Sequence, residues 1–597
     1  MLFKITAYLP FAQITPLQKP LSLFFCIFIL FSCTQEVRND KTIVFSITSP
    51  KPGWMYYENT KIIMAVNLNT DNIKWSSDTV GVLGKGNHLA LFLPQGLHCI
   101  KADIDGYTRE LSVYVSPSAD GMHTILVNYA PMEIKMKNGN CFSFAYTHDG
   151  IVNNFRMSQV PSMLTSPVSH NLLQTSHLSK SSETPSRDIR LPMPVVGKPV
   201  NQIRQRSIIR NSNTISNSYN LGDKRTFFVI NTGDQSGTPH NANAELVHQS
   251  NSLSVWVSDT ASLSGDVLEK CVEVVETLII PRVQTLWGKT SDIDNDGRIT
   301  LLFSPTLNDE GVLGFFNPAD FFIRNEDVTS NVYNPSSNEM DIIYVALPEI
   351  DPKSAYTPAS INATIAHELT HAATFTIKTW NRINSGNINA SREELFLDEG
   401  WSHLTESLCG LGISGGNINF VKRFFENTSA FSLCGQDDSA GMRGAITLFL
   451  SWLFWEAGGM SWDISDPVKL NCQGGISFLR RMVESPHTGW ESIGIAYGKH
   501  ISQLFNEFLY EMHDYRMTNN TYNYKTDPYT NEVVDFFVNM GETIGLGFPK
   551  TLSIYTGTSL LPWTFKFLDP FSLHNETLLT LNAGNISGTT FYSYTTR

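Results

Sequence analysis

The sequence has few charged residues and few long apolar runs, and each of these features excludes certain classes of protein. Charged residues make up 17% and hydrophobic residues 42% of its 597 positions, a balance typical of a folded globular chain rather than a disordered one. Beyond the first forty residues, no apolar run approaches the roughly 20 residues that a membrane-spanning helix needs. This excludes a polytopic membrane protein. The net charge of −13 argues against nucleic acid as the main partner, because phosphate binding needs a basic surface.

The N-terminus carries the features of an export signal. An uncharged apolar run at residues 21–31 follows Lys4 and Lys19, and a basic start followed by a short apolar run is typical of a signal peptide. The run ends in Leu30-Phe31-Ser32-Cys33, which resembles the lipobox of bacterial lipoproteins. We therefore expect residues 1–32 to be removed and Cys33 to be acylated, which would hold the protein on a membrane surface. The alternatives are an ordinary signal peptide or a short anchor, with Cys33 incidental.

Cysteine is also scarce, at 8 positions. None of these cysteines lies in a CxxC pair, so a zinc site held by thiolates is not expected. Six cysteines remain after Cys26 is removed with the signal and Cys33 is acylated, and an extracytoplasmic compartment permits disulfides. Because Cys409 and Cys434 are near in sequence, they are the pair we expect.

The spacing of short apolar runs predicts several domains. Between residues 41 and 116, β-rich runs alternate with turns about every ten residues, which predicts a β-sandwich. The segments Ile73-Lys74-Trp75-Ser76-Ser77 and residues 96–102 resemble bacterial Ig-like repeats, which implies a spacer or, alternatively, an adhesive surface. Residues 153–220 are rich in Ser, Thr, Asn, Pro and Arg, which predicts an exposed linker or a pro-segment.

The second half of the chain predicts an α+β unit. A β-rich lead-in is expected at 221–260, with strands at 225–230 and 253–257. The unit proper is expected at 261–515: a helical stretch follows residue 262, then come strands at 299–303 and 342–345, and helical periodicity dominates from there on. A small β-rich C-terminal module is expected at 525–597.

The clearest chemistry lies in His367-Glu368-Leu369-Thr370-His371. Residues four apart on a helix share one face, so both histidines can bind one metal ion, and Glu368 can accept a proton from a metal-bound water. Thr357 or Ser360 can cap this helix. The alternative for the bare motif is two surface histidines that flank a carboxylate. We expect the histidines to face away from the stripe that the helix buries, which comprises Ile361, Ile365, Leu369 and Ala372.

A third ligand is expected on the next helix. Catalytic zinc takes three protein ligands and keeps an open position for water, and two His with one Glu form a known set. Ser391-Arg392-Glu393-Glu394 matches a capping box, and Glu399 follows in an apolar helical stretch next to Gly400, which lets another backbone approach closely. His403 is the alternative ligand. If Glu399 is the ligand, we expect His403 and Asp398 to orient the metal ligands by hydrogen bonds. For Asp398 and Glu406, the alternative is a solvated helix face.

With Phe396-Leu397-Asp398-Glu399-Gly400 downstream of the HELTH motif, the chain resembles the gluzincin metallopeptidases. Within them it is most similar to the hyicolysin-type family, through residues 225–229, residues 255–257 and an aspartate-rich turn before the metal-binding helix. This resemblance covers about residues 221–515. It implies a zincin-type catalytic domain with a helical C-terminal subdomain, in which zinc activates a water and Glu368 acts as general base.

The chain departs from the thermolysin pattern in two respects. The spacing from His371 to Glu399 differs, and the position four residues after Glu399 is His403 rather than Asp. The donor that stabilises the oxyanion is therefore not carried over from that pattern. Four residues of the following helical region could supply it, and their spacing does not choose among them: Arg443, His487, Tyr497 and His500.

An acidic turn lies upstream of these motifs. Asp292, Asp294 and Asp296 occupy positions one, three and five of a loop with Gly297 at six, which matches the first half of an EF-hand-like calcium loop. Position twelve is Phe303 instead of the bidentate Glu. Two interpretations stay open: a low-affinity calcium site at the three aspartates, or an acidic turn that leads into the strand at 299–303 and holds no ion.

Together these patterns predict a lipid-anchored zinc endopeptidase that acts on extracytoplasmic proteins or peptides. Its expected location is the bacterial outer membrane, on the periplasmic or cell-surface face. A surface adhesin that keeps an inactive peptidase-like scaffold is the alternative from another class. An exopeptidase of the same clan is a third, but no glycine-rich or acidic motif of the aminopeptidase type precedes the HELTH motif.

Overall fold

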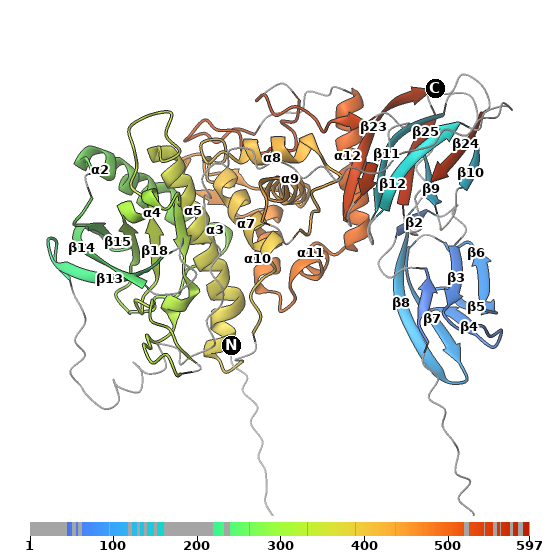
Figure 1. Ribbon diagram of the computed structural model, residues 1–597, viewed down its shortest axis with the longest axis horizontal. Helices are drawn as coiled ribbons and strands as arrows, with labels where there is room; N and C mark the ends of the chain where they lie inside the picture. The colour runs from blue at the N-terminus through green and yellow to red at the C-terminus, as the bar shows by residue number, and fades with distance from the viewer. Residues whose placement is uncertain are drawn as a thin grey trace, which may run out of the picture. The chain divides into compact units, whose positions relative to one another are not determined.

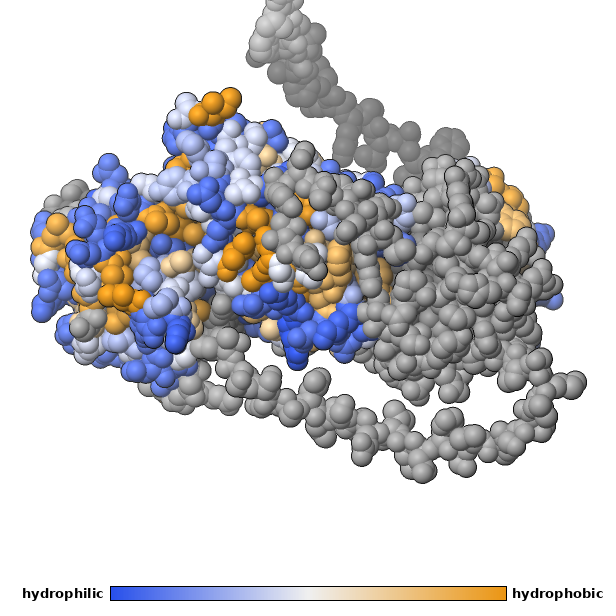
Figure 2. Space-filling model, turned by 90° about the horizontal axis from the view of Figure 1, so that it is seen from above, coloured by the Kyte–Doolittle hydropathy of each residue, from blue (hydrophilic) through white to orange (hydrophobic). Residues whose placement is uncertain are grey.

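The computed structural model describes residues 45–159 and 219–595, apart from short gaps within both ranges. The expected signal at 1–32, Cys33 and most of the expected linker lie outside the described residues. Among those described, no helix is both long and apolar enough to cross a membrane. Exposed apolar side chains such as Val82, Val328 and Ile464 come from distant parts of the chain, and Figure 2 shows apolar and polar residues interspersed on one face.

The N-terminal region is β-rich, as its turn spacing predicts. Buried Met64, Trp75, Ile100 and Val113 form part of its core, and the inward-facing positions recur along the strands as expected for sheets with one covered face. The Ig-like assignment stays a prediction. One sheet contains β1 (Ile47–Ser49), β3 (Ile62–Val66) and β6 (His88–Leu91), and the other contains, in order, β2 (Met55–Tyr57), β8 (Tyr107–Ser116), β7 (Gly96–Ile104), β4 (Lys74–Ser77) and β5 (Gly81–Lys85).

Strands from residues 122–159 pair with strands from the C-terminal end of the chain, in two sheets ordered β21-β23-β11-β25-β9 and β10-β24-β12-β22. Figure 1 shows the teal and red strands side by side. The range 525–597 therefore does not build its sheets alone, and β12 falls within the range whose composition predicts a linker. The strands are β9 (Met122–Val127), β10 (Met132–Met136), β11 (Asn140–Thr147), β12 (Val152–Gln159), β21 (Thr551–Leu552), β22 (Thr558–Leu560), β23 (Thr564–Ser572), β24 (Thr577–Asn582) and β25 (Thr589–Thr595).

A six-stranded mixed sheet supports the candidate site. Three of its strands, β15, β16 and β18, are parallel, and β17 pairs with β18 in the antiparallel direction at the edge. Every residue of β16 and β18 is buried, as expected for parallel strands covered on both faces. The strands expected from apolar runs are all present. In order, the sheet contains β13 (Lys224–Ile230), β14 (Pro239–Gln249), β15 (Leu253–Ser258), β16 (Ile299–Phe303), β18 (Ile342–Val345) and β17 (Gly314–Phe316).

The helix α5 (Pro358–Phe375) carries the HELTH motif and contacts both β17 and β18. It begins at the N-cap Thr357, whose Oγ1 accepts a hydrogen bond from the Ser360 backbone N at 3.2 Å, and Pro358 suits the first turn. All of its residues from Ser360 onward are buried. The expectation that α5 buries only its apolar stripe and leaves the histidine-bearing side uncovered is therefore wrong, because α7 (Leu395–Leu408) packs against α5.

The start of α7 also differs from expectation. Its N-cap is Glu394, without a side-chain cap, so Ser391 does not open a capping box. The Glu393 carboxylate instead lies 2.6 Å from Lys378 Nζ and accepts from the Gly489 backbone N at 2.6 Å. At Gly400, a Cβ would lie 2.6 Å from Cγ1 of Ile446, so side chains of α9 (Ala440–Glu456), rather than a backbone, approach this glycine.

The remaining helices extend the core beyond the sheet. Between β15 and β16, one continuous helical segment runs through α2 (Gly265–Val274), a π-helical turn (Val275–Ile279) and α3 (Ile280–Leu286), as the apolar stripe after residue 262 predicts. Short segments are α4 (Pro305–Asp309), α6 (Asn381–Asn384) and the pair β19 (Ser461–Trp462) and β20 (Leu470–Asn471). The longer ones are α8 (Asn417–Glu426), α9 (Ala440–Glu456), α10 (Gly474–Glu484), α11 (Gly489–Tyr497) and α12 (Ile501–Thr518).

The expected disulfide between Cys409 and Cys434 is wrong, because both thiols are free. Cys409 is fully buried at the end of α7, where burial raises the pKa of its thiol to about 12. Cys434 instead lies 3.3 Å from Ser432 Oγ. Nearness in sequence did not pair these two cysteines, and the helix α8 lies between them along the chain.

Candidate metal centre

Two helices bring together His367, His371 and Glu399. The histidines lie on consecutive turns of α5, with their Nε2 atoms 3.1 Å apart. From α7, Glu399 places Oε2 3.4 Å from His367 Nε2 and Oε1 3.7 Å from His371 Nε2. All three residues are at most 5% exposed, so their donor atoms face one another rather than solvent.

The donor set fits a zinc ion. Ligands about 2.0–2.1 Å from zinc and at tetrahedral angles to one another lie roughly 3.3 Å apart. The observed spacings are 3.1, 3.4 and 3.7 Å, close to this separation, and the two from Glu399 are measured to its two different carboxylate oxygens. Two imidazoles and one carboxylate also match the donor set of a hydrolytic zinc site.

Carboxylates behind the histidines fix the direction of both rings. His367 Nδ1 lies 2.8 Å from Glu406 Oε1, and His371 Nδ1 lies 3.1 Å from Asp398 Oδ1. These contacts leave the Nε2 atoms for a metal, the arrangement in which outer carboxylates orient metal-binding histidines. Asp398 and Glu406 are each 4% exposed, so neither lies on a solvated helix face.

Glu406 also binds His403, whose Nδ1 lies 2.8 Å from the same Oε1 atom. Burial raises the pKa of Glu406, but the neighbouring His403 and His367 lower it by more, so that its net value is about 2. Burial lowers the pKa of His403. An ionised carboxylate only accepts hydrogen bonds, so Nδ1 of each ring donates to Glu406.

Glu368 is held by the edge strand. Its Oε2 accepts a hydrogen bond from the Phe316 backbone N at 2.9 Å. The strand β17 approaches α5 this closely because Gly314 has no side chain: a Cβ there would lie 2.8 Å from Thr364 Cγ2 and 2.9 Å from the Tyr344 carbonyl oxygen. The sequence indicated Glu368 but gave no sign of the backbone donor at Phe316.

His403 is also close to the other ligands. One atom from each of His367, Glu399 and His403 lies within 4.8 Å of the others, so this trio competes with the set that contains His371. The Nε2 atom of His403 lies 3.1 Å from Arg443 Nη1. The Nε2 atom of His371 faces that of His367, whereas Nε2 of His403 faces a guanidinium.

Arg443 is the one of the four candidate oxyanion donors that contacts a candidate ligand. Its Nη1 lies 3.0 Å from Glu399 Oε2. His487 instead binds Glu491 at the surface, Tyr497 packs edge-on against Phe478, and His500 contacts Ser502.

In the structure, the acidic turn at residues 292–297 lies close to Asp341, a residue that the sequence pattern did not indicate. Ligand atoms of Asp292, Asp294 and Asp341 lie within 4.8 Å of one another, whereas Asp296 accepts from the Arg298 backbone N at 2.8 Å. Burial raises the pKa of Asp341 well above its ordinary value. The signal that was available is its position directly before the buried strand β18. Calcium binding at this turn stays a prediction.

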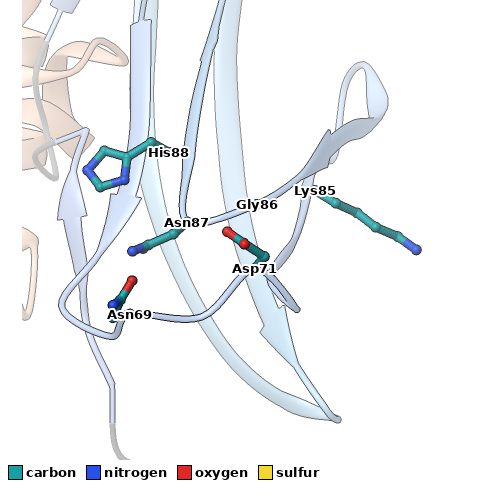
Figure 3. Close-up of a pocket in the computed structure, with 6 residues that line it drawn as sticks. All are labelled: Asn69, Asp71, Lys85, Gly86, Asn87 and His88. Carbon is teal, nitrogen blue, oxygen red and sulfur yellow. The ribbon is translucent and has the colours of Figure 1, made fainter.

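A shallow hollow of about 550 Å³ lies in the N-terminal β-rich region, lined by Asn69, Asp71, Lys85, Gly86, Asn87 and His88. Figure 3 shows Lys85 pointing away from the other labelled side chains. None of the candidate ligands lines this hollow. The metal centre is thus identified by its converging donor atoms, not by a cavity.

Comparison with known proteins gives one partial similarity. Over 171 residues the chain is 27% identical to the neutral metalloprotease ShpI of Staphylococcus hyicus. The matched stretch covers 27% of this chain and 35% of that protein, so the chain spans about a third of its relative's length. No family model matches the chain. The similarity and the His–Glu–His cluster together point to a metalloprotease, while the gluzincin and hyicolysin-type assignments stay predictions.

Proposed function

We propose that the protein is a zinc-dependent endopeptidase with His367, His371 and Glu399 as metal ligands. The observation that carries this proposal is the set of three donor spacings near the tetrahedral value, and the partial similarity to a neutral metalloprotease supports it. Zinc bound there would acidify a water molecule and polarise the scissile carbonyl.

Glu368 is the proposed general base. It lies next to His367 on α5, and the Phe316 backbone N fixes one of its carboxylate oxygens. A carboxylate in this position takes the proton of the attacking water and later delivers it to the leaving amine. Because Glu368 is 1% exposed, its surroundings are largely free of bulk water, which strengthens electrostatic interactions there.

Replacing Glu368 tests this function. Glu368→Gln keeps the size and one acceptor oxygen but removes the base, so zinc is retained while peptide hydrolysis falls by about 10²–10⁴-fold. The measurements are zinc content by atomic emission and cleavage of a quenched fluorescent peptide library. Glu426→Gln, at a carboxylate 46% exposed on α8, is the matched control. Wild-type turnover in zinc-loaded Glu368→Gln would rule out Glu368 as the base.

We also propose that the protein is exported and anchored through acylated Cys33. The support is the apolar run at 21–31 and the Leu-x-Ser-Cys ending. Metabolic labelling with an alkyne fatty acid tests this proposal: the label should be present in the wild-type protein and absent from Cys33→Ser. Label that persists in Cys33→Ser would overturn the anchor.

A further inference from the structure

We propose that Arg443 holds His403 off the metal and so keeps open the coordination position that hydrolysis needs. This inference rests on the proposed function, because it concerns the same metal centre. It assigns a positioning role to Arg443, which contacts both Glu399 and His403.

Three imidazoles gather around the metal centre, although the proposed ligand set contains two. The His403 and His371 rings lie 4.6 and 4.8 Å from that of His367, centre to centre. His403 also has a ligand atom within 4.8 Å of both His367 and Glu399. If His403 joined His367, His371 and Glu399 on zinc, all four tetrahedral positions would be filled by protein, which is the arrangement of a structural site.

The hydrogen bonds of His403 occupy both of its ring nitrogens. Arg443 has donors and no acceptor, so the contact of 3.1 Å makes His403 Nε2 the acceptor. The other nitrogen, Nδ1, then carries the proton and donates it to Glu406 Oε1 at 2.8 Å. The lone pair with which His403 would bind a metal is therefore directed at Arg443.

Arg443 is itself fixed in this position. Its Nε and Nη2 atoms each lie 2.8 Å from Asp438 Oδ1, and its side chain is 6% exposed. It stands in the first turn of α9, which Ser439 caps through a bond from the Met442 backbone N. Because several bonds hold the guanidinium, it can stay on His403 Nε2 when a cation binds nearby.

Removing the guanidinium should free that lone pair. Arg443→Met keeps much of the apolar stem and leaves no donor, so His403 can turn its Nε2 to the metal. The expected result is a change from two to three imidazoles on the metal and a loss of peptide hydrolysis. Zinc should also leave more slowly when EDTA is added, because a water ligand is replaced by a protein ligand.

The experiment compares full-length wild-type protein with Arg443→Met, each loaded with zinc or cobalt(II). X-ray absorption at the zinc edge counts the imidazoles, and the cobalt spectrum reports the coordination geometry. Arg423→Met, at an arginine 44% exposed on α8, is the control and should resemble wild type. The double variant Arg443→Met/His403→Phe should return to two imidazoles, which shows that the added ligand is His403 and not a consequence of misfolding.

Each outcome bears on the inference. A third imidazole in Arg443→Met that disappears in the double variant supports it. The inference is overturned if Arg443→Met has two imidazoles on the metal or if the wild type has three. It is also overturned if Arg443→Met and the double variant both bind no metal. Failure of the proposed function looks different: the wild type would bind no zinc, or Glu368→Gln would keep full activity.

Discussion

Glu406 binds two histidines through one oxygen, which predicts how the metal centre responds to loss of its charge. Oε1 lies 2.8 Å from Nδ1 of both His367 and His403. Glu406→Gln keeps the size of the side chain and an acceptor oxygen but removes the negative charge. Hydrogen bonds to charged groups contribute about 1.5–3 kcal/mol, and bonds between neutral groups contribute roughly half as much.

The substitution should therefore weaken each bond by about 0.75–1.5 kcal/mol. Residues that hydrogen-bond a metal-binding histidine typically contribute about 10–100-fold to metal affinity, and Gln keeps an acceptor for His367, so we expect a loss of about tenfold in zinc affinity. Both bonds together lower the unfolding free energy of the metal-free protein by about 1.5–3 kcal/mol. Full truncation to alanine would remove the acceptor that both histidines share and is a poorer probe, because it leaves two buried donors unpaired.

Competition with a chromophoric chelator measures the zinc affinity, and urea unfolding of the metal-free protein measures stability. Glu426→Gln, the exposed control on α8, should change neither quantity. A Glu406→Gln variant with wild-type zinc affinity and wild-type stability would refute the reasoning, because it would mean that the charge of Glu406 supports neither histidine.

Three further predictions follow from other contacts. Glu399→Ala should reduce zinc retention on dialysis far more than His403→Ala, and the reverse order would move the ligand to His403. Burial raises the pKa of Asp320 to about 7, so its contribution to stability is present below about pH 4 and is lost as pH rises to about 7. Asp320→Asn should therefore lose less unfolding free energy than the wild type between pH 4 and pH 7, by up to about 4 kcal/mol. Gly444→Ala would place a Cβ 2.0 Å from the Phe420 carbonyl oxygen and should lower the unfolding free energy in urea by about 1–3 kcal/mol. Unchanged stability would mean that α8 can shift away from the added Cβ without a loss of packing energy.

Local patterns predicted much of the chain because they depend on near neighbours in sequence. Fully apolar runs gave the strands β16 and β18, and the four-residue spacing placed His367 and His371 on one helical face. The pairing of β9–β12 with C-terminal strands could not be read in the same way. A strand's alternation shows which side chains face inward but not which distant strand lies beside it.

The contacts of the metal centre were partly beyond the sequence for the same reason. Arg443 was among four candidates, and only the packing of α9 against α8 and α7 brings it to Glu399. The donor at Phe316 is a backbone N–H group, which every residue except proline has, so the residue type at this position does not predict the contact. Glu406 looked equally suited to a solvated face, because burial depends on α5, which is distant in sequence.

The charges around the centre give a further physical reason for a divalent cation there. Two of the buried carboxylates pair with arginines, Asp398 with Arg392 and Glu399 with Arg443. Burial of a carboxylate is costly unless positive charge or hydrogen bonds compensate it. Because Arg443 is shared with a further carboxylate, that of Asp438, the two arginines compensate only part of this negative charge, and a divalent ion would compensate more of it. The carboxylates, each at most 4% exposed, are Glu368, Asp398, Glu399 and Glu406.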